Sequence, residues 1–239
     1  MYKETNTRSI VKTISWRILA TITTMSLVYI FIGDMTIAIS VGGIEVFLKM
    51  FIYFVHERAW DKIKFGRKEI KPVVIWITGL SRSGKSEIGK NLTNLLKEKG
   101  HKVEHLDGHT IREVIPGTGH SRHEVNEHIK RVGYLSKKLE EQGVIVVATF
   151  LSPYKESRDY VSNLVDNYKE IYISTPMEVC AARDDNGIFE RAKKGEIKDF
   201  PGVDVEYELS EKPMLTIDTT TTSTENAAKL IFNEIKKYL

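Results

Sequence analysis

The chain has 239 residues, of which 41% are hydrophobic and 28% are charged, and its formal net charge is +3. This length allows one large domain or an ordinary domain with an appended segment, and the mixed charges form no basic, aromatic-rich patch typical of nucleic-acid binding. The single cysteine, Cys180, excludes an intramolecular disulfide, and no group of His and Cys residues has the spacing of a zinc site. We therefore predict no nucleic-acid partner and no structural zinc.

Two apolar runs near the N-terminus have the length of membrane-spanning helices. They cover residues 14–32 and 35–55 and are joined by Gly33 and Asp34. At about 1.5 Å per helical residue, each run reaches roughly the 30 Å of a bilayer core. The pattern predicts an α-helical transmembrane hairpin that contacts membrane lipid through residues 14–55. The alternative is a buried helical hairpin in a soluble domain, because Ser and Thr dilute the first run and charges interrupt the second.

The charged residues fit the membrane interpretation. Glu45 and Lys49 are four residues apart, so they share a helix face and neutralise each other, and Arg17 lies near the start of the first helix. Basic residues precede the first run and follow the second, and the link has none. This distribution predicts that both termini and the following domain face the cytoplasm. The basic residues concerned are Lys3, Arg8, Lys12, Arg58, Lys62, Lys64, Arg67, Lys68 and Lys71.

Residues 1–71 also resemble a small family of predicted two-span membrane domains of unknown function. The resemblance is carried by residues 8–17, which begin Arg-Ser-Ile-Val-Lys, and by residues 57–60, Glu-Arg-Ala-Trp. It identifies a module but implies no chemistry.

From Pro72 onward, short apolar runs alternate with amphipathic stretches, which predicts a separate domain over residues 72–239. Such alternation is typical of an α/β fold, a parallel sheet covered by helices on both faces. The predicted strands are residues 73–78, 102–106, 144–150, 170–174 and 214–218. The predicted helices are a stretch that ends near residue 99, then residues 126–142, 156–166, 176–183 and 223–238.

Residues 79–86 match the phosphate-binding loop pattern G-x-x-x-x-G-K-[S/T] in full. The glycines let successive backbone N–H groups face phosphate oxygens, and the helix that follows points its positive end at the nucleotide. Lys85 adds a cation at the β- and γ-phosphates, and the Ser86 hydroxyl is expected to ligate Mg²⁺. We predict that ATP is bound by the whole loop: Gly79, Leu80, Ser81, Arg82, Ser83, Gly84, Lys85 and Ser86.

Asp107 and Gly108 follow the second predicted strand. In doubly wound sheets, ligands lie at the carboxyl ends of the strands, which places Asp107 beside the phosphate-binding loop. There it would orient Mg²⁺ or a nucleophilic hydroxyl group; the alternative is a turn residue paired with glycine. Arg112 either holds a phosphate or sulfate group or is a solvated surface arginine.

Nearly the whole of residues 72–239 is similar to the adenylyl-sulfate kinase family. The resemblance implies a P-loop kinase fold and transfer of the γ-phosphoryl group of MgATP to the 3′-hydroxyl of adenosine 5′-phosphosulfate, which is the sulfate-activation step of sulfate assimilation. It also suggests a homodimer. The motifs that carry it are residues 79–86, 106–108, 111–112, Gly119 with Ser121, 131–133, 151–154, 175–180, Arg183 with Asp184, Gly187 and 192–204.

The resemblance implies individual roles as well. Lys85 would hold ATP, while Ser86 and Asp107 would hold the magnesium ion. Arg112 would meet the phosphosulfate group of the acceptor, and Phe200 would stack on its adenine. The site would position the reactants for in-line transfer and neutralise their charge.

Two further segments have implied roles. Lys198 and Asp199 would lie in a lid that closes over both nucleotides, and Leu151 and Ser152 would line the acceptor side. In the family, the serine that matches Ser152 is proposed as a transient phosphoserine, which makes it a candidate catalytic residue. We favour direct transfer.

The chain departs from the family pattern on the acceptor side. The family has Asp-Gly-Asp, with the second aspartate a candidate base; here His109 stands there, and an imidazole still accepts a proton at neutral pH. Where the family has a stacking Phe, an Arg and an Asn, this chain has His120, Val125 and His128, of which we count the two histidines as acceptor ligands. Losing the arginine removes a charged contact worth roughly 1.5–3 kcal/mol.

These departures leave alternatives to the leading hypothesis. One is the same phosphoryl transfer to another nucleotide-linked hydroxyl compound. Another is a non-catalytic ATP-binding membrane module, against which the intact lid-like run at residues 192–204 argues, because a binding module does not need it.

Overall fold

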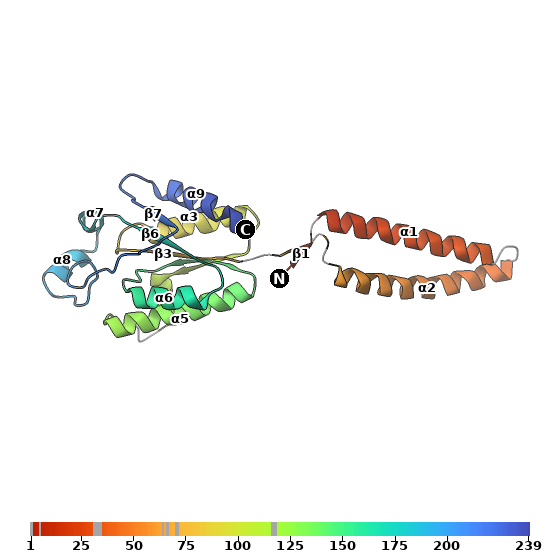
Figure 1. The fold of residues 1–239 in the computed structure, drawn as a ribbon, viewed down its shortest axis with the longest axis horizontal. Coiled ribbons are helices and arrows are strands. Elements are labelled where there is room, and N and C mark those ends of the chain that lie inside the picture. Colours follow the sequence, from red (N-terminus) through yellow and green to blue (C-terminus); the bar gives the residue numbers. More distant parts are fainter. Residues whose placement is uncertain are drawn as a thin grey trace. The chain divides into compact units, whose positions relative to one another are not determined.

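The computed structural model describes residues 2–4, 6–30, 35–63, 65, 67–69, 72–115 and 119–239. The chain divides into two compact units, Met1–Ile70 and Lys71–Leu239 (Figure 1).

The first unit is an antiparallel helical hairpin with a short strand pair. Helix α1 (Asn6–Ile30) packs against α2 (Met35–Lys62). Strand β1 (Tyr2–Glu4) precedes α1 and pairs with β2 (Arg67–Glu69) in an antiparallel two-stranded sheet that the sequence did not predict. In Figure 1 the two helices lie side by side along their length.

Arg8 closes the end of this hairpin. Its buried guanidinium donates hydrogen bonds to the backbone carbonyl oxygens of Trp60, Ile63 and Phe65 over 2.5–2.7 Å. It also lies 5.1 Å from the centre of the Trp60 ring. Because the last carbonyl groups of a helix have no partner within the helix, Arg8 caps α2 at its C-terminus.

Side chains also join the two helices directly. Lys12 forms an ion pair with Glu57 over 3.0 Å, and Trp16 makes an edge-on contact with Tyr53, with ring centres 4.9 Å apart. The residues that carry the resemblance of this segment are thus largely those that hold α1 against α2.

The predicted membrane spans are not supported by the structure. Within the part of the chain that the structure describes, no helix combines the length and the apolar character needed to cross a bilayer. Thr13, Thr23 and Ser26 of α1 donate hydrogen bonds to backbone carbonyl oxygens of their own helix. The side chain of Glu45 lies outside the described residues, so its pairing with Lys49 and the cytoplasmic orientation stay predictions.

The second unit contains the predicted parallel sheet, which is confirmed. Its strands are β3 (Val74–Gly79), β4 (Val103–Asp107), β5 (Ile145–Thr149), β6 (Tyr168–Ile173) and β7 (Leu215–Ile217). They are all parallel and lie in the order β4-β5-β3-β6-β7. The strand that leads into the phosphate-binding loop is therefore the central one.

Helices cover both faces of this sheet (Figure 1). On one face lie α3 (Lys85–Glu98) and α9 (Thr224–Ile235), and on the other lie α5 (Arg122–Glu141) and α6 (Lys155–Leu164). A short 3₁₀ turn, η1 (Lys236–Tyr238), ends the chain.

Alternation along β3 builds the two cores. Ile75 and Ile77 pack with α3 and α9, whereas Val74 and Trp76 pack with α5 and α6, and all four side chains are fully buried. Successive side chains of a strand point to opposite faces, so a continuous apolar run fills both layers.

Three helices around the sheet edge are short. They are α4 (Gly108–Val114), α7 (Met177–Ala182) and α8 (Ile188–Lys193); of these, only α7 was predicted. Asp107 caps α4 by accepting a hydrogen bond from the backbone N–H of His109. Such brief helices depend on their caps and not on an apolar period, which is why the pattern did not reveal α4 and α8.

Candidate active site

The phosphate-binding loop joins β3 to α3 at the centre of the sheet. Gly79 has a φ of 148°, and a Cβ atom there would lie 2.5 Å from the carbonyl oxygen of Ile173 on β6. Gly84 has a φ of 95° and is the N-cap of α3. Only glycine fits both positions without strain, because one is crowded by backbone and the other is left-handed.

Lys85 is the first residue of α3, and its ammonium group folds back over the loop. Nζ donates hydrogen bonds to the carbonyl oxygen of Leu80 over 2.5 Å and to Oγ of Ser83 over 3.4 Å. Burial lowers the pKa of Lys85 to about 8, against the opposing effects of Cys180 and Asp107. Lys85 is thus a desolvated cation whose charge a phosphate group would stabilise.

Asp107 lies at the end of β4, where several donors converge on its carboxylate. Thr149 Oγ1 donates to Oδ2 over 2.9 Å, the backbone N–H of His109 donates to Oδ1 over 3.0 Å, and the Ser86 side chain forms a further hydrogen bond. Burial alone would raise the pKa of Asp107, but these bonds outweigh it, and the pKa is lowered. The carboxylate is therefore ionised at neutral pH.

Ser86 and Asp107 form a donor set suited to Mg²⁺. A hydroxyl and a carboxylate oxygen are hard ligands, and Mg²⁺ in kinases is held by one or two protein groups together with substrate phosphates and waters. Across the described residues, no group of three or more His, Cys, Asp or Glu side chains has the arrangement of a metal cage. The residues present fit an ion that arrives with the nucleotide.

A second set of hydrogen bonds holds the backbone of the phosphate-binding loop at Ser83. Thr219 Oγ1 donates to the carbonyl oxygen of Ser83 over 3.1 Å and accepts a hydrogen bond from Arg183 over 2.6 Å. Thr175, at the end of β6, shares a 2.7 Å hydrogen bond with the same hydroxyl group. Arg82, in the loop itself, has a φ of 60° and lies 3.4 Å from the buried carboxylate of Asp184.

The residues predicted to bind the acceptor differ in exposure. His128 of α5 is buried beside Phe150, with ring centres 6.0 Å apart, and neither of its ring nitrogens has a hydrogen-bond partner among the described residues. Burial, followed by the charges of Arg112 and Arg131, lowers the pKa of His128 to about 4, so its imidazole is neutral at physiological pH. Val125, on the same helix, is buried as well.

Three other predicted residues lie nearer to solvent. His109 and His120 are exposed, and Arg112 is half-buried and donates to the carbonyl oxygen of Gly119 over 3.3 Å. Residues 116–118 lie outside the part of the chain that the structure describes.

Ser152 has a core environment. Its Oγ accepts a hydrogen bond from the indole N–H of Trp76 over 3.0 Å, its carbonyl oxygen accepts one from Arg158 over 2.7 Å, and its φ is 38°. The neighbouring carbonyl of Leu151 accepts a hydrogen bond from Thr78 over 2.7 Å. The strained backbone at Ser152 is therefore held by bonds from three directions.

The segment of residues 192–204, predicted as a lid, forms a turn over the loop. Asp204 accepts hydrogen bonds from the backbone N–H groups of Asp199 and Phe200, over 2.9 and 2.6 Å, and Asp199 has a φ of 57°. A Cβ atom on Gly202 would lie 3.0 Å from Leu80, so this turn packs on the phosphate-binding loop. Phe200 contacts Phe189 edge-on.

The structure therefore brings Lys85, Ser86 and Asp107 together. Lys198 is exposed on the lid segment.

Sequence analysis missed Thr149 and Thr219. The register of β4 with β5 pairs Thr149 directly with Asp107, and such pairing leaves no local signal in the sequence. Every non-glycine residue with positive φ in the described part, namely Arg82, Ser152 and Asp199, lies in a segment that was predicted to form the site.

Comparison with known proteins agrees with this geometry. A family model described as adenylylsulphate kinase matches residues 71–218, and one described as a predicted membrane protein matches residues 10–61. A probable adenylyl-sulfate kinase of Aeropyrum pernix is 36% identical over 171 residues, which cover 70% of this chain and 93% of the relative. The adenylyl-sulfate kinase of Microcystis aeruginosa is 37% identical, and the match covers 68% of this chain and 91% of that relative.

Among solved structures, the APS kinase of Mycobacterium tuberculosis in complex with AMPPNP and APS is similar to this chain with a TM-score of 0.66. It is 27% identical, and the match covers 70% of this chain and 99% of that structure.

Proposed function

Since the chain belongs to the adenylyl-sulfate kinase family, we propose that it transfers the γ-phosphoryl group of ATP to the 3′-hydroxyl of adenosine 5′-phosphosulfate. The observation that supports this proposal best is the contact set at the centre of the sheet. There the Ser86 side chain hydrogen bonds with the ionised carboxylate of Asp107, and the desolvated ammonium group of Lys85 interacts electrostatically with the same carboxylate.

On the donor side, the loop amides and Lys85 hold the β- and γ-phosphates of ATP. Mg²⁺, when bound at Ser86 and Asp107, supplies charge neutralisation for the phosphates. Phosphoryl transfer needs little covalent help from the protein, so positioning and electrostatics supply most of the catalysis. His109, which follows the carboxylate in sequence, is the proposed acceptor of the proton from the 3′-hydroxyl group.

On the acceptor side, Arg112 holds the phosphosulfate group and Phe200 stacks on adenine, with Lys198 at the edge of the lid. His120, His128 and Leu151 complete the pocket. Transfer is direct, because Ser152 is only 1% exposed and its hydroxyl group is bonded to Trp76 in the core.

A second candidate function rests on the interior of α5. Val125 is buried where the family has an arginine, and His128 is buried and neutral where the family has an asparagine. The first change removes a charged contact from the pocket, and the second replaces an amide with a neutral imidazole. They favour a less anionic acceptor, such as another nucleotide-linked hydroxyl compound, with the same phosphoryl-transfer chemistry.

A coupled assay on the full chain with MgATP and adenosine 5′-phosphosulfate tests the first proposal. Lys85→Ala removes the phosphate-binding cation, and Lys90→Ala on the exposed side of the same helix is the matched control. We expect turnover that Lys85→Ala abolishes and Lys90→Ala retains. If nucleotide binds but no 3′-phosphorylated product forms, this acceptor is wrong, and turnover with another nucleotide-linked compound would establish the second candidate.

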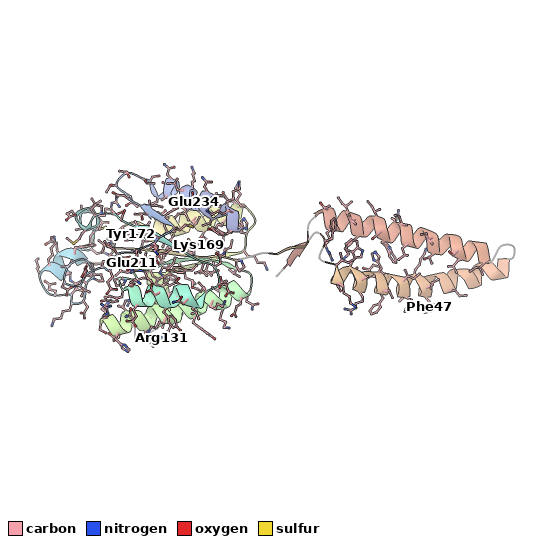
Figure 2. The ribbon with its side chains drawn as sticks, in the orientation of Figure 1. Phe47, Arg131, Lys169, Tyr172, Glu211 and Glu234 are labelled. Carbon is pink, nitrogen blue, oxygen red and sulfur yellow. The ribbon has the colours of Figure 1, made fainter. Side chains whose placement is uncertain are left out.

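We also propose that the α1–α2 hairpin attaches the chain to a lipid surface. Large apolar side chains lie exposed on both helices; Phe47, labelled in Figure 2, is 75% exposed, and Ile14 and Ile18 are 54% and 57% exposed on one face of α1. A family described as predicted membrane protein matches this segment. Contiguous apolar surface of this kind marks a membrane or protein contact.

Flotation of the full chain with anionic vesicles tests this attachment. Replacing Phe47 and Phe51 by Glu should abolish flotation, whereas replacing the exposed Tyr134 and Tyr160 of the kinase unit by Glu should not. Extraction at alkaline pH then separates surface attachment from insertion. The proposal would be overturned in favour of self-association by two results together. The unmodified chain would fail to float with vesicles, and on size exclusion it would elute as an oligomer that is lost when Phe47 and Phe51 are replaced.

A further inference from the structure

A hydrogen-bonded chain leads from Asp107 to a histidine in the same strand. Thr149 Oγ1 lies 2.9 Å from Oδ2 of Asp107 and 3.0 Å from Nε2 of His105. His105 and Asp107 are two residues apart on β4, so both side chains lie on the same face of the sheet. Thr149 is only 2% exposed and faces Asp107 across the β4–β5 pair.

The direction of these bonds follows from the donors available. The carboxylate of Asp107 only accepts, so the single hydroxyl hydrogen of Thr149 points to Asp107. The Thr149 oxygen must then accept its second bond, which requires that Nε2 of His105 carries a hydrogen. The geometry therefore selects the Nε2–H tautomer of a neutral His105, or its protonated form.

Helix α3 covers this chain at Gly89. A Cβ atom on Gly89 would clash with Cγ2 of Thr149 and would lie 2.6 Å from Nε2 of His105. Any larger residue would push the two partners apart. The same helix begins at Lys85 and carries Ser86, whose side chain also hydrogen bonds with Asp107. The carboxylate thus has both Ser86 and the Thr149–His105 pair as side-chain partners.

We propose that His105 and Thr149 are positioning residues that fix the orientation of the Asp107 carboxylate for Mg²⁺–nucleotide binding. This inference rests on the proposed function only in placing Mg²⁺ at Ser86 and Asp107, and it is independent of the acceptor. Side chains that orient a metal-binding group typically contribute about 10–100-fold to metal affinity. Because Thr149 touches the carboxylate and His105 acts through it, Thr149 has the larger effect.

Two calorimetric titrations of the full chain with ADP, one in the presence of Mg²⁺ and one in the presence of EDTA, measure how much the metal ion contributes to nucleotide binding. We expect Thr149→Val to weaken binding of Mg²⁺–ADP by about tenfold and to leave metal-free ADP binding unchanged. Thr149→Ser, which keeps the hydroxyl group, should bind like the unmodified chain. His105→Leu should weaken Mg²⁺–ADP binding about threefold to tenfold, the range for one hydrogen bond, and His105→Gln, which retains a donor, should recover most of it.

A spectroscopic readout separates positioning from a general structural effect. In the chain labelled with ¹⁵N-histidine, His105 should show the Nε2–H tautomer, and Thr149→Val but not Thr149→Ser should shift it. His123→Gln, on the exposed face of α5, is the control for histidine loss. An Nδ1–H tautomer at His105, or unchanged Mg²⁺–ADP affinity in both Thr149→Val and His105→Leu, would overturn the inference. Neither result depends on which acceptor the kinase uses, so failure here and failure of the proposed function are distinguishable.

Discussion

Thr219 donates its hydroxyl hydrogen to the carbonyl oxygen of Ser83 over 3.1 Å, so a residue that follows β7 holds the phosphate-binding loop that follows β3. The Thr219 oxygen also accepts a hydrogen bond from Arg183. A backbone carbonyl in a tight loop has few other partners, so this bond helps to hold the loop amides toward the nucleotide.

Thr219→Val should therefore raise the KM for ATP. Loss of one such hydrogen bond costs about 1 kcal/mol, which corresponds to roughly a fivefold change. The KM for the acceptor should stay unchanged, and steady-state kinetics with each substrate varied in turn measures both. Thr220→Val, at the exposed neighbouring position, is the matched control. Equal effects on both KM values would show that Thr219 acts on the whole fold and not on the loop.

Lys85 should couple nucleotide binding to proton uptake. Its pKa of about 8 means that a growing fraction of the free protein has a neutral Lys85 above that pH, whereas phosphate groups favour the charged form. The contribution of Lys85 to nucleotide affinity should thus be constant well below pH 8 and should fall as the pH passes through about 8. At pH 8.5, calorimetry in two buffers with different heats of ionisation should detect roughly 0.75 proton taken up per nucleotide. Uptake that persists in Lys85→Ala would assign it to another group.

Gly79→Ala should destabilise the kinase unit more than a glycine replacement without a clash. The new Cβ atom would meet the carbonyl oxygen of Ile173 at 2.5 Å, whereas a Cβ atom on Gly100, also at positive φ, would have no other atom within 4 Å. Both variants incur the cost of a left-handed backbone, about 1–2 kcal/mol, and Gly79→Ala adds the steric term. Thermal unfolding with and without nucleotide compares them; equal melting temperatures would contradict the crowding at Gly79.

Arg8→Leu should loosen the hairpin while the kinase unit stays folded. The change leaves the carbonyl oxygens of Trp60, Ile63 and Phe65 without their charged donor, at a cost of roughly 1.5–3 kcal/mol. Hydrogen exchange should accelerate across residues 6–30 and 35–62. The exposed Arg58, changed to Leu, serves as the control. Unaltered exchange in Arg8→Leu would mean that helix packing alone holds the hairpin.

His128→Asn should tighten binding of adenosine 5′-phosphosulfate if that compound is the acceptor. The change restores the residue type that the family uses and replaces an imidazole that has no hydrogen-bond partner among the described residues with an amide that both donates and accepts. We expect the KM for the acceptor to fall about fivefold, with the KM for ATP unchanged. His123→Asn on the exposed face of α5 controls for the substitution itself. A higher KM for the acceptor would favour a different acceptor fitted to His128.

Much of the kinase unit followed from local pattern. The β3 run, the phosphate-binding loop and the start of α3 are contiguous, so the identities of Gly79, Gly84 and Lys85 predict both structure and chemistry. The alternation of strands and helices predicted a parallel sheet, and the order of motifs identified the family. The membrane spans that the apolar runs predicted were not confirmed within the described residues of α1 and α2.

Sequence by itself thus determined the class of protein, because a nucleotide-binding loop is encoded in eight consecutive residues. Only the tertiary structure decided what surrounds the loop. The register of β4 with β5 pairs Thr149 with Asp107. Thr219, which follows β7, hydrogen bonds with Ser83 in the loop that follows β3. The packing of α3 on the sheet places Gly89 against His105. Each of these contacts joins residues from different elements, and hydrogen bonds between distant segments have no periodicity or spacing that the chain displays before it folds.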